Sequence, residues 1–227
     1  MTEFVNIKIV SSQQELDDAF DVRRKVFVEE QKIHPSLEFD GNDFCATHIV
    51  AYVNEKPVGT MRIRYFSDFV KFERMSVLPE LRKSNISDLI MKTATKFCAQ
   101  KGYHTIHGVC KKELLSRWAK DGAFPIKGAD PVIQNGMTLV PIEQKIPQTE
   151  KNVNLQTPLD ILNKKEGQWF KEETIENTNE LITKDRLNHI QNMKQKVKEL
   201  KTSPNKPLKT YVSPKCDVLE IESINAR

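Results

Sequence analysis

Apolar and polar residues alternate along parts of the first third of the chain, which is the pattern of half-buried strands. Residues 4–10 and 58–66 show it most clearly, and apolar runs over 48–53 and 69–77 predict two further strands. The sequence Asn-Glu-Lys-Pro at 54–57 is typical of a hairpin turn. We therefore expect an antiparallel meander in this region.

Helical patterns stand on both sides of the meander. Ser12 and Glu15 have the spacing of a capping box, which predicts the start of a helix. Apolar residues recur every three or four positions over 86–101, and Gly102 is suited to end that second helix. Residues 29–44 have no regular period and are expected to form a loop, with at most a helical turn.

The second half of the chain carries weaker patterns. They predict a strand over 105–110, a short helix over 113–120 and a closing strand over 137–142. The composition becomes more polar after residue 146, where we place a domain boundary. An α/β domain would then span residues 1–146, and a mostly helical extension would span residues 147–227.

The extension has helix signals of its own. Thr157 followed by Pro158 predicts a helix start. An apolar stripe over 180–201 predicts a longer helix that packs against the first domain or against a second copy of the chain, so a homodimer is one expected assembly. Residues 218–224 are expected to form an edge strand.

Composition excludes several classes of protein. With 38% hydrophobic residues and no run of 18 apolar residues, the chain is expected to be soluble, without a membrane span. Its start lacks the features of a signal peptide, so we expect a cytoplasmic location. A net charge of +4 does not argue for nucleic-acid binding. Four scattered cysteines, and histidines such as His34 and His48 far from other ligands, predict no metal site.

The most informative segment is the junction of the fourth strand with the second helix. At such a junction, backbone N–H groups converge at the positive end of the helix dipole and can bind a pyrophosphate. Arg82 and Lys83 add two positive charges to the loop. The alternative is an ordinary strand-to-helix connection with solvated charges.

This junction resembles the acyl-coenzyme A (acyl-CoA) loop of the GNAT N-acyltransferases. Asn85 and Ser87 depart from the family pattern, because they stand where it prefers glycine. Residues 4–146 as a whole resemble a bacterial GNAT subgroup. The matching residues of the loop are Val77, Pro79, Arg82 and Ile86, and further similar stretches are 22–31, 38–43, 46–48, 57–62 and 72–77.

The resemblance implies a fold, a reaction and partners. The fold is a mixed, mainly antiparallel, twisted sheet flanked by helices. The reaction is transfer of an acyl group, with acetyl-CoA or another acyl-CoA as co-substrate and no metal, by direct attack of a primary amine in a ternary complex. The amine acceptor would be a small molecule or a peptide.

The resemblance also assigns the donor site. Backbone groups of Met75 and Val77 would contact the pantetheine arm. Asn85 could adopt a left-handed backbone in place of glycine, and Ser87 could cap the helix. The pyrophosphate would be bound by the amides of Arg82, Lys83, Ser84, Asn85, Ile86 and Ser87.

Glu73 is the candidate general base. By strand alternation it should share a face with Met75 and Val77, and a carboxylate inside the cleft can have a raised pKa. The alternative for Glu73 is a salt bridge, with partners such as Arg62. An acidic rim that suits an amine acceptor is predicted from Glu29, Glu30, Asp40 and Asp43, whose alternative is a solvated loop.

The general acid is less well defined. Trp118 stands where many family members have a tyrosine, and indole cannot donate a proton usefully. The thiolate would then leave unassisted or take a proton from water. Other candidates for the acid are Tyr65, Tyr103, His107 and Cys110.

Two other functions remain open from the sequence. The matching stretches also resemble acyl-homoserine-lactone synthases and N-acyl amino acid synthases, which implies acyl carrier protein as an alternative donor and partner. Lysines beside the apolar stripe at 180–201 offer a surface for such an acidic partner. The second alternative is a catalytically decayed GNAT-fold module that only binds a ligand or partner.

Overall fold

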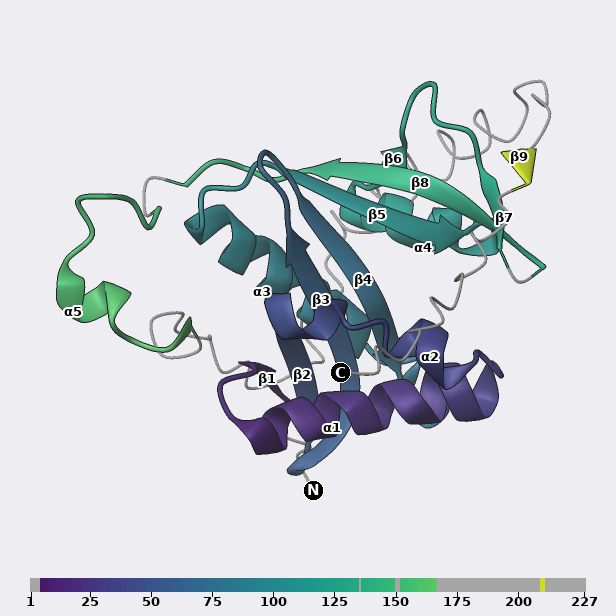
Figure 1. The fold of residues 1–227 in the computed structure, drawn as a ribbon, viewed down its shortest axis with the longest axis horizontal. Coiled ribbons are helices and arrows are strands. Elements are labelled where there is room, and N and C mark those ends of the chain that lie inside the picture. Colours follow the sequence, from purple (N-terminus) through teal and green to yellow (C-terminus); the bar gives the residue numbers. More distant parts are fainter. Residues whose placement is uncertain (1–4, 135, 150–151, 167–208, 211–227) are drawn as a thin grey trace, which may run out of the picture.

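The computed structural model of the 227-residue chain describes residues 5–134, 136–149, 152–166 and 209–210. One sheet runs through them in the order β1-β2-β3-β4-β5-β8-β7-β9, with β6 paired to β8 (Figure 1). The strands are β1 (Val5–Ile9), β2 (Thr47–Val53), β3 (Lys56–Tyr65), β4 (Val70–Val77), β5 (Thr105–Lys111), β6 (Phe124–Pro125), β7 (Val132–Gln134), β8 (Met137–Lys145) and β9 (Lys209–Thr210).

Short helices and turns connect these strands, and two longer helices cover the sheet. The α-helices are α1 (Gln13–Arg23), α2 (Pro35–Glu38), α3 (Ile86–Gln100), α4 (Leu115–Trp118) and α5 (Leu159–Leu162). A π-helical segment, η1 (Arg24–Glu30), continues α1, and the 3-10 turns are η2 (Asn42–Cys45), η3 (Pro79–Leu81), η4 (Lys112–Leu114) and η5 (Ala119–Asp121).

The predicted meander is confirmed, since β1 to β4 pair in antiparallel fashion in chain order. Asn54 and Glu55 form the turn between β2 and β3, with φ of 48° and 65°. Two consecutive left-handed residues match the right-handed twist of the flanking strands, as in a type I′ hairpin. The predicted fold class, a mixed and mainly antiparallel sheet with helices, is therefore correct.

The core has two layers because successive residues of β2 point to opposite faces of the sheet. Val50 and Tyr52 pack with Ala19 of α1. Ile49 and Ala51 belong to the main core, which includes the apolar side of α3. A Cβ on Gly59 would stand only 3.0 Å from Ile90 Cδ1, so a glycine lets α3 lie close against β3.

Helix α3 starts and ends close to the predicted positions. Asn85 is its N-cap, and Gly102 follows its end with φ of 84°. The N–H of Tyr103 donates to the Cys98 carbonyl over 3.0 Å, which satisfies one of the last free carbonyls of the helix. The predicted stop at Gly102 is confirmed.

Residues 29–44 differ most from expectation. The chain there forms the end of η1, then α2 and the start of η2, rather than an open loop. The sequence has no periodicity that predicts these short elements, because ion pairs between buried side chains hold them in place. The short strands β6 and β7 were likewise not predicted.

In the part of the extension that the structure describes, the predictions from the sequence hold only in part. Pro158 is the N-cap of α5 rather than its first residue, and the Thr157 hydroxyl accepts the N–H of Asn154 at 2.8 Å instead of capping the helix. The Val153 N–H donates to the Gln100 carbonyl over 2.7 Å, which ties the segment to α3. The helix predicted over 180–201 and the strand over 218–224 lie outside the described residues. Within the described residues, no helix is long and apolar enough to cross a membrane.

Candidate active site

The adjacent strands β4 and β5 part halfway along their length. They pair in parallel only from Val70 to Phe72 and from Ile106 to Gly108, and beyond this point they diverge (Figure 1). The edge of β4 from Glu73 to Val77 therefore has no neighbouring strand on its β5 side among the described residues. Unpaired backbone groups along a strand edge can bind an extended ligand.

A β-bulge lies at the same place. Thr60 pairs with Ser76 and Arg62 with Glu73, so two residues of β4 stand opposite one residue of β3. One of the two is Arg74, whose φ of 55° is left-handed. An inserted residue kinks the strand and reverses the side-chain alternation beyond it.

The bulge contradicts one expectation about Glu73. Met75 and Val77 belong to the core on the α3 side, together with Phe72. Glu73 points to the α1 side, where it meets Arg62. The prediction that Glu73 shares a face with Met75 and Val77 was wrong, because simple alternation does not hold across the bulge.

Glu73 is surrounded by positive charge. Its carboxylate lies 2.7 Å from Lys71 Nζ and 2.8 Å from Arg62 Nη2, and its side chain is 9% exposed. Burial raises the pKa of Glu73, but Lys71 and Arg62 outweigh it, so the pKa lies below its ordinary value. This is the opposite of the raised pKa that we expected. The role of Glu73 as general base stays a prediction. The group that would accept the proton is an ionised carboxylate.

The loop after β4 places Arg82 beside the open strand edge. Its Nε donates to the Val77 carbonyl over 3.1 Å. Its two terminal nitrogens bind the carboxylate of Glu30 in a bidentate pair, with Nη1 2.7 Å from Oε1. Glu30 is the last residue of η1, so this ion pair joins the loop to η1.

The backbone amides of the loop fall into two groups. Those of Arg82, Ser84 and Ile86 donate to acceptors within the turn itself. The amides of Lys83, Asn85 and Ser87 have no acceptor within the part of the chain that the structure describes. Three of the six amides predicted to bind pyrophosphate are therefore engaged elsewhere, and three are available.

Two details of this loop correct the sequence analysis. Asn85 has φ of −88°, so it does not adopt the left-handed backbone that we expected in place of glycine. Ser87 is not the cap of α3, since it lies inside the first turn, where its hydroxyl accepts from Arg117 Nη2 at 2.9 Å.

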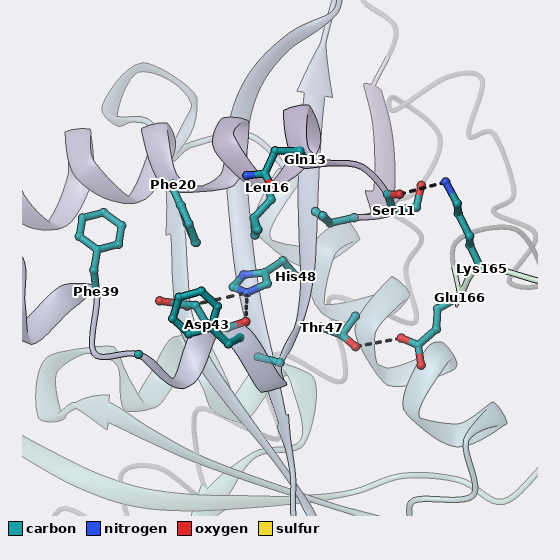
Figure 2. A pocket seen from close by; sticks show the side chains of 14 residues that line it. Ser11, Gln13, Leu16, Phe20, Phe39, Asp43, Thr47, His48, Lys165 and Glu166 are labelled. Atoms are coloured by element: carbon teal, nitrogen blue, oxygen red, sulfur yellow. Dashed lines mark hydrogen bonds and ion pairs between the residues drawn. The ribbon is translucent and has the colours of Figure 1, made fainter.

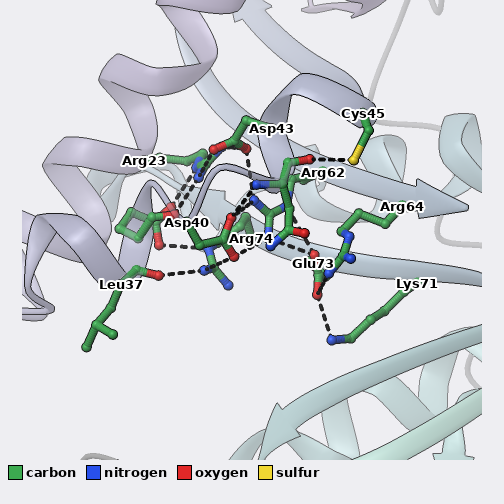
Figure 3. A network of polar contacts seen from close by, with 12 residues as sticks. Arg23, Leu37, Asp40, Asp43, Cys45, Arg62, Arg64, Lys71, Glu73 and Arg74 are labelled. Atoms are coloured by element: carbon green, nitrogen blue, oxygen red, sulfur yellow. Dashed lines mark hydrogen bonds and ion pairs between the residues drawn. The ribbon is translucent and has the colours of Figure 1, made fainter. Parts of the chain in front are cut away.

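The predicted acidic rim divides into separate groups. Glu30 binds Arg82, and Glu29 is exposed without a charged partner among the described residues. Asp40 and Asp43 lie in a network with buried arginines (Figure 3). That these four residues bind the amine stays a prediction.

Arg62 is the centre of this network, and its side chain is fully buried. Its Nη1 lies 2.7 Å from Asp40 Oδ1 and 2.9 Å from Asp43 Oδ1. Arg23, also fully buried, binds Asp43 at 2.6 Å and Glu38 at 2.6 Å. The network thus fastens α2 and η2 to the sheet next to Glu73.

The carboxylates of the network are held in their charged form. Burial raises the pKa of Asp40 and of Asp43, but hydrogen bonds from the guanidinium groups outweigh it and hold both values below the ordinary range. Arg23 and Arg62 were missed by sequence analysis as anchors. For Arg62 the available signal was its place between the apolar residues Met61 and Ile63 of β3. No such signal marks Arg23, which Arg24 and Lys25 follow.

The candidates for the general acid lie in different surroundings. The Tyr65 hydroxyl donates to Thr47 Oγ1 over 2.7 Å. The Tyr65 ring contacts Tyr103, at the end of the sheet where β4 and β5 are paired. Burial lowers the pKa of His107 and raises that of Cys110 to about 11, so Cys110 is a protonated thiol at neutral pH. Trp118 packs against the core.

Comparison with known proteins agrees with this architecture. The acetyltransferase (GNAT) family model matches residues 15–113. Over 109 residues the chain is 36% identical to a provisionally named acetyltransferase of Bacillus subtilis, BSU40680, covering 46% of this chain and 74% of that protein. It is 39% identical over 94 residues to the uncharacterised N-acetyltransferase YjcF of Bacillus subtilis, covering 41% of this chain and 67% of that protein.

Solved structures show the same fold at low sequence identity. A provisionally named N-acetyltransferase from Lactobacillus plantarum has a TM-score of 0.60 and 21% identity, covering 63% of this chain and 99% of that one. The CoA-dependent acyl-homoserine lactone synthase BjaI has a TM-score of 0.55 and 15% identity, covering 84% of this chain and 100% of that one. By sequence and by fold, the chain belongs to the GNAT acetyltransferase family.

Proposed function

We propose that this protein transfers an acetyl group from acetyl-CoA to a primary amine, by direct attack in a ternary complex. GNAT enzymes use an acyl-CoA as co-substrate. The observation that carries the proposal is the parting of β4 and β5 beyond Phe72 and Gly108, next to the loop that carries Arg82. The free edge of β4 suits the amide groups of pantetheine, and the start of α3 suits the pyrophosphate.

The donor would be held by backbone groups and one guanidinium. Met75 and Val77 offer the strand edge. The available amides of Lys83, Asn85 and Ser87 lie at or next to the start of α3, where the helix dipole favours an anion. Arg82 would bind the pyrophosphate in the bidentate geometry that guanidinium groups form with phosphates as well as with carboxylates.

In the structure, the Glu30 carboxylate binds both terminal nitrogens of Arg82. A pyrophosphate would replace this carboxylate, because both anions use the same two terminal nitrogens of Arg82. The released Glu30 could then bind the amine acceptor. This exchange favours an order in which the donor binds before the amine.

Replacement of Glu30 by glutamine should strengthen donor binding. The E30Q variant no longer pairs a charge with Arg82, so the Kd for acetyl-CoA should fall about three- to fivefold, the size that an exposed ion pair permits. Calorimetry with acetyl-CoA measures this change. The matched control is Glu29→Gln, which removes a neighbouring exposed charge and should leave the Kd unchanged. Weaker donor binding by E30Q would contradict the exchange.

In the chemical step, the amine nitrogen attacks the thioester carbonyl carbon and the carbon–sulfur bond breaks. Glu73, ionised beside Lys71 and Arg62, would take a proton from the amine through water. The CoA thiolate would take a proton from water, since Trp118 has no acidic group to offer.

The interior next to the parting strands supports a short acyl group. A cavity of about 20 Å³ lies there, which is room for about one water molecule. Phe72 and Gly108, the last paired residues of β4 and β5, line it, and so do Met91 and Trp118. Such a space suits the methyl group of acetyl rather than a long chain.

Trp118→Ala should therefore widen the range of acyl donors. We expect wild type to prefer acetyl-CoA over hexanoyl-CoA, and the variant to shift the ratio of kcat/KM values toward hexanoyl-CoA by about tenfold or more. Trp118→Phe, which keeps a ring in the cavity, serves as the control. Equal use of both donors by the wild-type enzyme would disprove the limit on chain length.

The proposed activity is tested by release of free CoA from acetyl-CoA in the presence of a panel of primary amines, with mass spectrometry of the products. Acylated amine from acetyl-CoA supports the proposal. Product that appears only with acyl carrier protein as donor would replace the proposal by carrier-dependent synthesis.

We also propose that residues 147–227 form an extension distinct from the catalytic domain.

A further inference from the structure

A row of polar side chains crosses four strands of the sheet where β4 and β5 begin to part. Arg64 of β3 stands opposite Lys71 of β4. His107 of β5 stands between Lys71 and Glu143 of β8. Residues opposite each other in register share one face of the sheet, and Lys71 contacts Glu73 on that face. The row therefore lies beside the candidate general base.

The first two members of the row, Arg64 and Lys71, are both cations. Like charges directly opposite each other on neighbouring strands are destabilising unless an anion lies between them. Here the anion is Glu73, whose carboxylate is 2.7 Å from Lys71 Nζ and 3.9 Å from Arg64 Nη1 (Figure 3). The same carboxylate is 2.8 Å from Arg62 Nη2, so three cations share one carboxylate.

The network around Glu73 carries an excess of positive charge. Its ion pairs join five cationic side chains to four carboxylates, which leaves an excess of one: the cations are Arg23, Arg62, Arg64, Lys71 and Arg74, and the carboxylates are Glu38, Asp40, Asp43 and Glu73. His48, which contacts Asp43, is uncharged at neutral pH because burial lowers its pKa. Burial also raises the pKa of Glu38, which can only increase the excess.

The excess charge lies at the exposed end of the network. Two of its arginines are fully buried, and Arg74 has two carboxylate partners of its own, at 2.9 and 3.2 Å. The side chains of Arg64 and Lys71 are 25% and 29% exposed, and among the described residues Glu73 is their only partner of opposite charge. An anion from solution can therefore reach both groups.

The other two members of the row do not supply the missing negative charge. Glu143 is bound by Lys145 at 3.3 Å. Burial lowers the pKa of His107, so its ring is uncharged at neutral pH. An anionic ligand at Arg64 and Lys71 would thus meet no free carboxylate within the row.

Aromatic rings border the row and hold Arg64 in place. The Arg64 guanidinium lies 5.3 Å from the centre of the Phe66 ring. Phe66 stacks on Phe69 with the ring centres 4.7 Å apart, and Phe69 contacts His107. Because the guanidinium is positioned before a ligand binds, less conformational entropy is lost on binding.

The larger pocket on the α1 side of the sheet is a less suitable place for an anion. It has a volume of about 700 Å³ and is bounded by the first half of α1, the start of β2 and the η2 turn (Figure 2). The carboxylate of Asp43 there is bound by two arginines, and that of Glu166 by Lys101. Lys165 donates to the Ser11 carbonyl. None of the described residues that line this pocket comes from β4 or β5, so it is separate from the row.

We propose that the acceptor of the acyl-transfer site is an amino acid, whose carboxylate is bound by Arg64 and Lys71 while its amine nitrogen lies near Glu73. This inference rests on the proposed acetyl transfer. An excess of one positive charge matches the single negative charge of a carboxylate better than the charge of a phosphate. The Lys71 ammonium has three donors, so it can bind Glu73 and the ligand at once.

The test compares glycine, L-leucine and L-phenylalanine, each with its own carboxamide, as acceptors for the full chain at saturating acetyl-CoA and neutral pH. Loss of the carboxylate lowers the pKa of the amine, so more of the amide is in the reactive neutral form. Chemical reactivity alone thus favours the amides. We expect the opposite order, with kcat/KM about tenfold higher for the accepted amino acid than for its amide.

Three results would overturn the inference and leave acetyl transfer itself standing. They are equal or higher kcat/KM for the amides, a preference for O-phosphoethanolamine over the amino acids, and turnover only of amines that have no carboxylate. Absence of acetylation of every amine would reject the proposed activity, and this inference with it.

Two exposed substitutions test the assigned residues. Arg64→Met and Lys71→Met should each lower the ratio of kcat/KM for amino acid over amide by about fivefold. An indirect effect through Glu73 would change both acceptors by the same factor and leave this ratio constant. Arg64→Lys, which keeps the charge, should retain most of the preference. The control is Lys56→Met, at an exposed lysine at the other end of β3, which should leave the ratio unchanged. A constant ratio in both methionine variants would reject the anion site at Arg64 and Lys71.

Discussion

The Arg82→Ala variant is expected to bind acetyl-CoA about ten- to a hundredfold more weakly than the wild-type protein. A charge-assisted hydrogen bond from a guanidinium to a phosphate contributes about 1.5–3 kcal/mol, and no other guanidinium in the loop replaces it. The Glu30–Arg82 pair is exposed, so its loss should not unfold the protein. Calorimetry with acetyl-CoA and with desulfo-CoA measures the change.

The control for this experiment is Lys83→Ala. Lys83 has the same charge and the next position in the loop, and its side chain is exposed. A small effect of Lys83→Ala beside a large effect of Arg82→Ala would tie the loss to the bidentate group. An Arg82→Ala variant that binds acetyl-CoA as tightly as wild type would refute the donor site at this loop.

The Arg62→Met variant is expected to be destabilised by about 3–5 kcal/mol. Methionine is long enough to fill much of the space, but it leaves Asp40, Asp43 and Glu73 without their shared partner. The side chains of Asp43 and Glu73 are only 7% and 9% exposed, so water cannot replace the guanidinium. Denaturant unfolding at neutral pH measures the free energy of unfolding.

Arg64→Met is the matched control, two residues further along β3. The Arg64 side chain is 25% exposed and lies 3.9 Å from Glu73, so its removal should cost less than about 1 kcal/mol. Equal losses in the two variants would show that the buried network has no special role in stability.

The pH dependence of stability gives a second measure of this network. The pKa values of Asp40, Asp43 and Glu73 are lower in the folded protein than in the unfolded chain. Their contribution is therefore fully present above about pH 4–5 and is lost as the pH falls below that range. Glu38 opposes this trend, because burial raises its pKa. The Arg62→Met variant should lose less stability on acidification than wild type, and a steeper loss would contradict this assignment.

Local patterns in the sequence were sufficient for the main elements. Alternation predicted β1 and β3, apolar runs predicted β2 and β4, the helical period predicted α3, and Gly102 marked the end of α3. These predictions succeeded because each depends on neighbouring residues: the period of burial, the cap and the turn. The strand-to-helix junction with Arg82 could be found in the same way, since it is continuous in sequence.

Contacts between distant segments decided the rest. The bulge at Arg74 turns Glu73 away from Met75 and Val77, and alternation along one strand cannot reveal it because a bulge is defined by pairing with β3. The partners of Glu30 and Asp43 lie on other elements, so sequence spacing does not show that Arg82, Arg23 and Arg62 bind them.

The sequence by itself determined the main strands and helices, the family likeness and the candidate donor loop. Only the tertiary structure decided where β4 and β5 part, which loop amides stay available, and how the acidic residues divide between Arg82 and the buried network. The physical reason is that periodicity and capping act over a few residues. Strand pairing and the neutralisation of buried charge act between segments that are far apart in the chain and meet only on folding.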